Sequence, residues 1–140
     1  MRVSVISTII SFGLLCLSNA AYSVELISNN NLQVESLSLN VARAIFSGRM
    51  KYWEDGTPVR VVMLNSNASM HVKFCSEVLQ LYPRQLKRSW DMIVFSGGGE
   101  GPQIVSTEDE LLKKVSLTAG AIGYIGSYKG DMEVKLVKVK

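Results

Sequence analysis

His71 and Cys75 are the two residues whose types and spacing come closest to a catalytic pair. They lie four positions apart, so on a helix their side chains would be neighbours. A histidine beside a thiol can act as the base that makes the thiol a nucleophile. The alternative is a cysteine buried in the core behind a histidine on the surface. Because no carboxylate stands where it would orient the histidine, we predict that the protein is not an enzyme.

The sequence lacks the residues that other common sites of chemistry need. His71 is the only histidine in the chain, so a conventional zinc site would lack ligands. The stretch FSGGGEGP, residues 95–102, is rich in glycine, but no Lys-Ser or Lys-Thr follows it as in a nucleotide-binding P-loop. The acidic residues at 54–55 and 108–110 are explained as turn and helix-start residues. We therefore predict no metal and no cofactor.

Small polar residues stand where helices are expected to begin. Backbone N–H groups at the start of a helix can bind anions, assisted by the helix dipole and by hydroxyl donors. The alternative is plain capping, because every helix needs a cap and most caps bind nothing. The candidate anion-binding residues are Ser38, Asn65, Ser66, Asn67 and Ser69.

Strands and helices are expected to alternate along the chain, which indicates an α/β domain. We expect strands early in residues 24–36, over 59–64 (VRVVML), over 120–125 (GAIGYI) and over 134–139 (VKLVKV), the last as an edge strand protected by its lysines. Four helices are expected: one capped by Ser38 and stopped at Gly48, one capped by Ser69, one with Pro83 in its first turn, and one that starts with a capping box at Thr107.

The first residues have the three parts of a Sec-type signal peptide: a basic start at Arg2, an apolar run over residues 3–17 and small residues at positions 18 and 20. We predict cleavage after Ala20 or Ser23, which leaves residues 24–140 as one domain. The alternative is an uncleaved membrane anchor, although the apolar run is shorter than the roughly 20 residues of a membrane span.

Removal of a signal peptide would also remove Cys16 and leave Cys75 as the only cysteine, so no internal disulfide can form. Export without a disulfide predicts a bacterial periplasmic protein held together by its core. The full chain has 15 Lys and Arg residues against 12 Asp and Glu residues. This balance argues against a nucleic-acid partner, which would require a concentrated basic face.

Three stretches taken together resemble the substrate-binding proteins of bacterial phosphate ABC transporters. They are LSLNVARAIFSGRMKYWEDGTPV at residues 37–59, Ser89-Trp90 with Phe95–Gly97, and AGAIGYIG at residues 119–126. The resemblance covers roughly residues 24–128. It implies a periplasmic-binding-protein-like (type II) lobe with a central mixed sheet flanked by helices. It also implies that the glycine-framed strand expected over residues 120–125 lies in that sheet, where its glycines let neighbouring segments approach closely.

The resemblance also implies where a ligand would bind and how this chain differs from the family. The early anion loop of the family has no counterpart here, and the later Arg-x-Asp-Gly-Ser-Gly-Thr loop aligns with MLNSNASM, residues 63–70. Hydroxyl and amide groups remain at Asn65, Ser66, Asn67 and Ser69, but the arginine, the aspartate and the glycines are absent. We therefore expect weak binding of phosphate or a similar oxyanion, assisted by Ser38, with an ABC permease or envelope protein as partner. The alternative is an interaction module that has lost its ligand.

Overall fold

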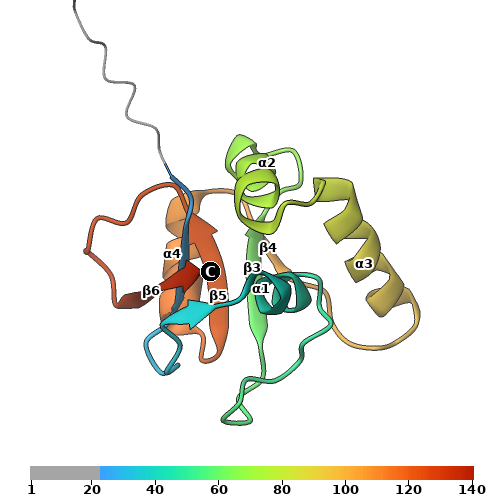
Figure 1. Cartoon of the computed structure of the whole chain (residues 1–140), viewed down its shortest axis with the longest axis horizontal. Helices are drawn as coiled ribbons and strands as arrows, with labels where there is room; N and C mark the ends of the chain where they lie inside the picture. Colours follow the sequence, from blue (N-terminus) through green and yellow to red (C-terminus); the bar gives the residue numbers. More distant parts are fainter. Residues whose placement is uncertain (1–22) are drawn as a thin grey trace, which may run out of the picture.

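The computed structural model describes residues 23–140, which form a mixed sheet with helices packed against it (Figure 1). The predicted signal peptide lies almost entirely outside the described residues. The strands are β1 (Glu25–Asn29), β2 (Ser36–Leu37), β3 (Arg60–Leu64), β4 (Gln103–Val105), β5 (Ala121–Ile125) and β6 (Val134–Val139). The helices are α1 (Leu39–Phe46), α2 (Ser69–Phe74), the π-helical turn η1 (Cys75–Leu79), α3 (Pro83–Phe95) and α4 (Glu108–Leu117). The predicted α/β class is confirmed.

The strands are ordered β2-β6-β1-β5-β3-β4, and among them only β1 runs antiparallel to its neighbours. The other five strands therefore end at the same edge of the sheet, which we call the carboxyl edge. Three helices begin at this edge, because α1 follows β2, α2 follows β3 and α4 follows β4. In α/β sheets, ligands usually bind at this edge.

The terminal strand β6 is not an edge strand, contrary to the prediction from its lysines. It pairs with β1 over Val134–Val137 and with β2 at Lys138 and Val139. The edges are formed by β2 and β4, neither of which was predicted. Both strands are too short to show an alternating pattern, so they depend on their neighbours in the sheet for stability.

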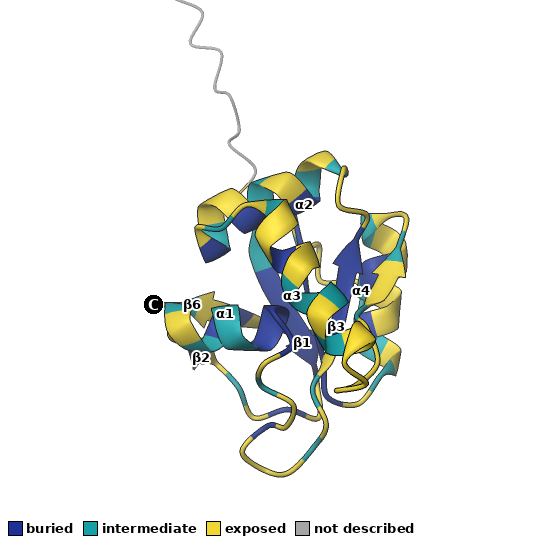
Figure 2. Ribbon diagram, turned by 90° about the vertical axis from the view of Figure 1, so that its right-hand side faces the viewer, coloured by how far each residue is buried: buried dark blue, intermediate teal, exposed yellow. Residues whose placement is uncertain are grey.

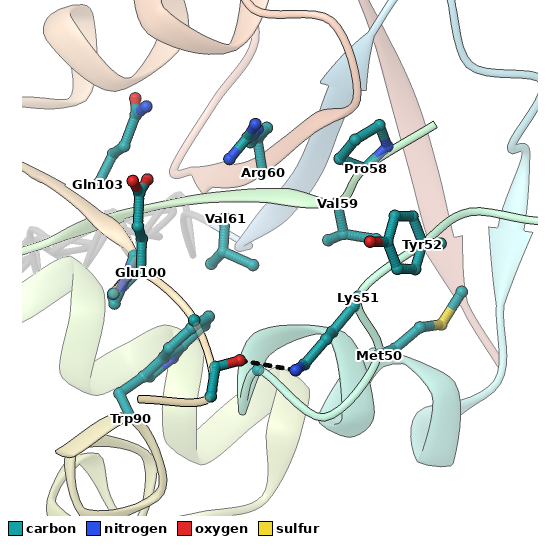
Figure 3. A pocket seen from close by; sticks show the side chains of 15 residues that line it. Met50, Lys51, Tyr52, Pro58, Val59, Arg60, Val61, Trp90, Glu100 and Gln103 are labelled. Carbon is teal, nitrogen blue, oxygen red and sulfur yellow. Dashed lines mark hydrogen bonds between the residues drawn. The ribbon is translucent and has the colours of Figure 1, made fainter. Parts of the chain in front are cut away.

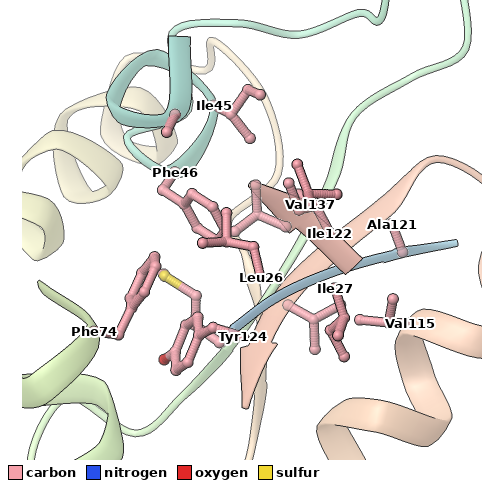
Figure 4. Packing of buried hydrophobic residues seen from close by; sticks show 14 of the residues in the cluster. Leu26, Ile27, Ile45, Phe46, Phe74, Val115, Ala121, Ile122, Tyr124 and Val137 are labelled. Carbon is pink, nitrogen blue, oxygen red and sulfur yellow. The ribbon is translucent and has the colours of Figure 1, made fainter. Parts of the chain in front are cut away.

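The core lies between the sheet and the helices and centres on three aromatic rings (Figure 4). Tyr124 of β5 stacks on Phe74 of α2 with ring centroids 3.9 Å apart, and Phe46 of α1 meets the Phe74 ring edge-on at 4.7 Å. All three side chains are fully buried. Because each such side chain stabilises the fold by about 1.5–3 kcal/mol, this cluster fixes α1 and α2 on one face of the sheet.

Two glycines around β5 are required by close contacts. Gly120 has φ +75°, and a Cβ there would lie 2.1 Å from the carbonyl oxygen of Pro58. A Cβ on Gly123 would lie 2.6 Å from Cδ2 of Leu111 in α4. Strand β5 lies inside the sheet, between β1 and β3. Its glycines allow neighbouring segments to approach closely, as the resemblance implied.

Candidate functional site

The candidate anion loop, residues 65–69, leaves the carboxyl end of β3 and enters α2. The N–H group of Ala68 donates to the carbonyl oxygen of Asn65 at 2.9 Å and closes a turn, so the helix begins one residue later. Ala68 is therefore the N-cap, and no side chain of the described residues caps the helix. The prediction that Ser69 caps α2 is wrong, because the turn places Ser69 inside the first turn of the helix.

Within the described part of the chain, the start of α2 has hydrogen-bond donors without a side-chain cap. Val72 donates to the carbonyl oxygen of Ala68 at 3.0 Å, and the preceding N–H groups of Ser69, Met70 and His71 have no acceptor within the described residues. Unsatisfied N–H groups of a first helical turn need water, a side chain or a ligand. The side chains of the polar loop residues, Asn65, Ser66, Asn67 and Ser69, are exposed beside them.

Ser38 does not belong to this loop. It caps α1, where its Oγ accepts from the N–H of Val41 at 3.2 Å. Ser38 directly follows β2, which stands four positions from β3 in the sheet. At about 4.8 Å per strand, this separation is roughly 19 Å. Plain capping accounts for Ser38, and it cannot contact an ion held at residues 65–69.

A small cavity of about 190 Å³ adjoins the loop and is lined by both Ser66 and Lys87. Lys87 comes from α3 and supplies a positive charge that the loop itself lacks. Its Nζ donates to Oδ2 of Asp91 at 2.7 Å, and Asp91 lines the same cavity. The i, i+4 spacing of Lys87 and Asp91 is visible in the sequence, but the packing of their helix beside Ser66 is not.

The pair His71 and Cys75 is buried together with Tyr124. Cys75 Sγ lies 3.5 Å from His71 Nε2, and His71 Nδ1 lies 2.5 Å from the Tyr124 hydroxyl. The same hydroxyl accepts from the N–H of Leu64 at 3.0 Å. The Tyr124 hydroxyl therefore shares hydrogen bonds with both the backbone of β3 and the His71 ring, whose other nitrogen faces the sulfur.

Burial disfavours the charged forms of these three groups. It raises the pKa of the Cys75 thiol to about 11, lowers the pKa of His71 and raises the pKa of Tyr124. A nucleophile would need a thiolate, which is not populated at neutral pH here. Cys75 is a packing cysteine, as the alternative held, but the expectation of a surface histidine is wrong because His71 is only 2% exposed.

A larger hollow of about 430 Å³ lies at the amino end of β3 and is bordered by Trp90, Tyr52 and Arg60 (Figure 3). The Nζ of Lys51 donates to the carbonyl oxygen of Gly98 at 2.6 Å and joins the two sides of this hollow. The length of β3, roughly 17 Å at about 3.3 Å per residue, separates Arg60 from Asn65. This hollow is therefore separate from the anion loop.

Residues 23–140 contain neither a cluster of metal ligands nor a helix that could span a membrane. No group of three or more His, Cys, Asp and Glu side chains in this range lies close enough to hold a metal ion. No helix in this part of the chain is both long and apolar enough to cross a membrane.

The fold matches solved structures of bacterial phosphate-binding proteins. A phosphate ABC transporter substrate-binding protein from Clostridium perfringens, with bound phosphate, matches 83% of this chain at TM-score 0.63 and 22% identity. PstS from Borrelia burgdorferi matches 84% at TM-score 0.64 and 13% identity. A phosphate transport receptor from Vibrio cholerae matches 85% at TM-score 0.59 and 14% identity.

The fold is that of a periplasmic-binding-protein-like domain. The matches cover 44%, 47% and 48% of the three solved chains, so this PBP-like domain spans less than half of their length. Neither the protein-family models nor the curated proteins gave a match to the sequence.

Proposed function

We propose that this PBP-like domain is an exported, non-enzymatic binding protein that holds phosphate or a similar oxyanion weakly at residues 65–69. The observation that carries the proposal is the start of α2, where three N–H donors have no acceptor within residues 23–140 and the hydroxyls of Ser66 and Ser69 are exposed. The loop lies at the carboxyl edge of the sheet. Solved structures that are similar to this fold include a protein crystallised with phosphate.

Weak binding follows from the kinds of donor present. Neutral hydrogen bonds are roughly half as strong as charge-assisted ones, and residues 65–69 contain no arginine or lysine. Lys87, which lines the adjacent cavity, is neutralised by Asp91 at 2.7 Å. We expect millimolar affinity, about 4 kcal/mol. This role would place the protein in the periplasm beside an ABC permease or another envelope protein.

Isothermal titration with phosphate, sulfate and a neutral solute of similar size tests the proposal. We expect weak heat with the oxyanions and none with the neutral solute. Repeating the phosphate titration with Ser66→Ala locates the site, because Ser66 lines the adjacent cavity. Absence of heat with any anion would reject the proposal.

The competing function is an interaction module that kept the fold but lost the ligand. It is favoured by the Lys87–Asp91 ion pair, which neutralises the cation beside the loop. Its candidate surfaces are the basic helix at Arg84, Lys87 and Arg88 and the lysines of β6. Capture of a specific envelope protein that is lost on charge reversal of that helix, together with no anion binding, would favour this function.

A further inference from the structure

Helix α3 has one face fixed on the domain and one face exposed to solvent (Figure 2). On the inner face, Leu86 is buried, Trp90 Nε1 donates to the carbonyl oxygen of Phe46 at 2.8 Å, and Ser89 Oγ donates to that of Ser47 at 2.8 Å. These contacts fix the rotation of the helix about its axis. The side chains opposite them are therefore held outward.

The outer face of α3 carries arginines in its first half, Asp91 paired with Lys87 in its middle, and apolar side chains at its end. Arg84, Arg88 and Phe95 lie within about 40° of one another around the helix, at about 100° per residue. Phe95 is 90% exposed, Met92 is 67% exposed and Val94 is 50% exposed. Large exposed apolar side chains gathered at one end of a helix are a feature of interaction sites.

Within residues 23–140, the two arginines of this face have no acidic partner. Arg84 lies over the ring of Tyr82, 5.7 Å from its centroid, and among the described residues the one ion pair of α3 joins Lys87 to Asp91. Another carboxylate, that of Glu100, lies in the loop that follows the helix. The face therefore keeps an excess of positive charge next to its apolar end.

We propose that the outer face of α3 binds the surface of an anionic phospholipid membrane. Arg84 and Arg88 would contact lipid phosphates while Met92, Val94 and Phe95 enter the interfacial layer. Basic residues beside exposed aromatic and aliphatic residues are the composition of interfacial helices. In a symmetric dimer this face would meet itself and place arginines against arginines, so a second copy fits less well. This inference is independent of the proposed anion site.

Vesicle co-sedimentation tests the proposal with residues 23–140, which contain the whole sheet and core and omit the apolar run at 3–17. The probes are vesicles of phosphatidylglycerol with phosphatidylcholine and vesicles of phosphatidylcholine alone. We expect binding only to the anionic vesicles, and weaker binding as salt is raised. Replacing both arginines by glutamate should weaken binding by at least about 25-fold, about fivefold for each cation lost. Phe95→Ser should weaken it by about tenfold.

Helix α4 supplies matched controls. Lys113 and Lys114 are exposed, and Leu117 is 74% exposed, so the charge reversal of both lysines and Leu117→Ser make equivalent changes on another face. We expect both controls to bind the anionic vesicles as wild type does, and circular dichroism to show that all variants are folded. Equal losses in the α4 variants, or no binding to anionic vesicles, would overturn the proposal.

Sedimentation velocity and calorimetry separate the alternatives. A dimer in solution that Phe95→Ser abolishes would identify a second copy as the occupant of this face and overturn the membrane assignment. Inorganic phosphate should not displace the protein from vesicles, and Phe95→Ser should leave the heat of phosphate binding unchanged. These results distinguish failure of the membrane proposal for α3 from failure of the anion site at residues 65–69.

Discussion

At the scale of single residues, the Tyr124 hydroxyl links three parts of the core. It accepts from the backbone of β3 at Leu64 and is hydrogen-bonded to His71 of α2, which faces Cys75. All of these groups are buried, so each depends on its partner for hydrogen bonding. A buried donor that loses its partner costs about 1–3 kcal/mol. The chain of contacts therefore has a structural role at the base of the candidate anion loop.

The buried histidine makes stability depend on pH. Because burial lowers the pKa of His71, the unfolded chain binds a proton at about pH 6.5 that the folded protein does not bind until a lower pH. Stability should therefore fall as the pH drops below about 6.5. Urea titrations of wild type and His71→Gln at several pH values measure the effect. If wild type and His71→Gln lose the same free energy of unfolding between pH 7 and pH 5, His71 does not contribute to the pH dependence of stability.

Ser66 and Ser69 should both affect anion binding, and neither should affect stability much. Ser69→Ala removes no cap, because Ala68 occupies that position, so we expect a change in the free energy of unfolding of less than about 0.5 kcal/mol. Melting temperatures of wild type, Ser66→Ala and Ser69→Ala with and without phosphate measure both effects. Equal stabilisation of all three proteins by phosphate would place the anion elsewhere.

At the scale of elements, the end of α1 fixes the position of α3. Gly48 has φ +79°, and a Cβ there would lie 2.6 Å from Ile93 Cδ1 and 2.8 Å from Trp90 Cζ3. The glycine thus stops α1 and leaves room for the inner face of α3 at the same time. The hydrogen bonds from Ser89 and Trp90 to the carbonyl groups at the end of α1 complete this junction.

Gly48→Ala should therefore destabilise the domain more than a comparable change elsewhere. Gly56→Ala is the matched control, since Gly56 has φ +86° but no described atom within 4 Å of the point where a Cβ would lie. The control should lose about 1 kcal/mol, from backbone strain alone. Gly48→Ala should lose about 1–3 kcal/mol more, from overpacking, and should shift the fluorescence of Trp90. Similar losses in the two variants would show that α3 adjusts without cost.

At the scale of the whole molecule, the strand order decides which candidate residues meet. It separates Ser38 from residues 65–69 by roughly 19 Å at about 4.8 Å per strand. The packing of α3 beside the end of β3 brings Lys87 and Ser66 to one cavity. The charge available to a bound anion therefore depends on a helix that follows the loop in sequence and carries its own counter-ion.

Release of Lys87 from its ion pair should strengthen phosphate binding. Asp91→Asn removes the carboxylate 2.7 Å from Nζ and leaves the ammonium free to face the cavity. We expect about a fivefold gain in phosphate affinity at low salt, since an exposed charge pair is worth up to about 1 kcal/mol. Calorimetry measures the gain, and Lys87→Met serves as the opposite control. An unchanged affinity in Asp91→Asn would exclude Lys87 from the site.

The sequence by itself determined the elements whose signals are local. Ser38 and Gly48 mark the two ends of α1, Pro83 opens α3, and the apolar runs become β3 and β5. These signals are caps, breakers and hydrophobic periods, which act within a few residues of the chain. The α/β class follows from their alternation.

Only the tertiary structure shows which strands and side chains lie next to one another. The short strands β2 and β4 form because longer strands pair with them. Strand β6 was predicted at an edge, but β2 occupies that edge. The turn at residues 65–68 moved the start of α2 past the expected cap, and the core enclosed a histidine expected at the surface. Strand order and the burial of a polar side chain such as His71 arise from contacts between distant segments, and no local pattern encodes them.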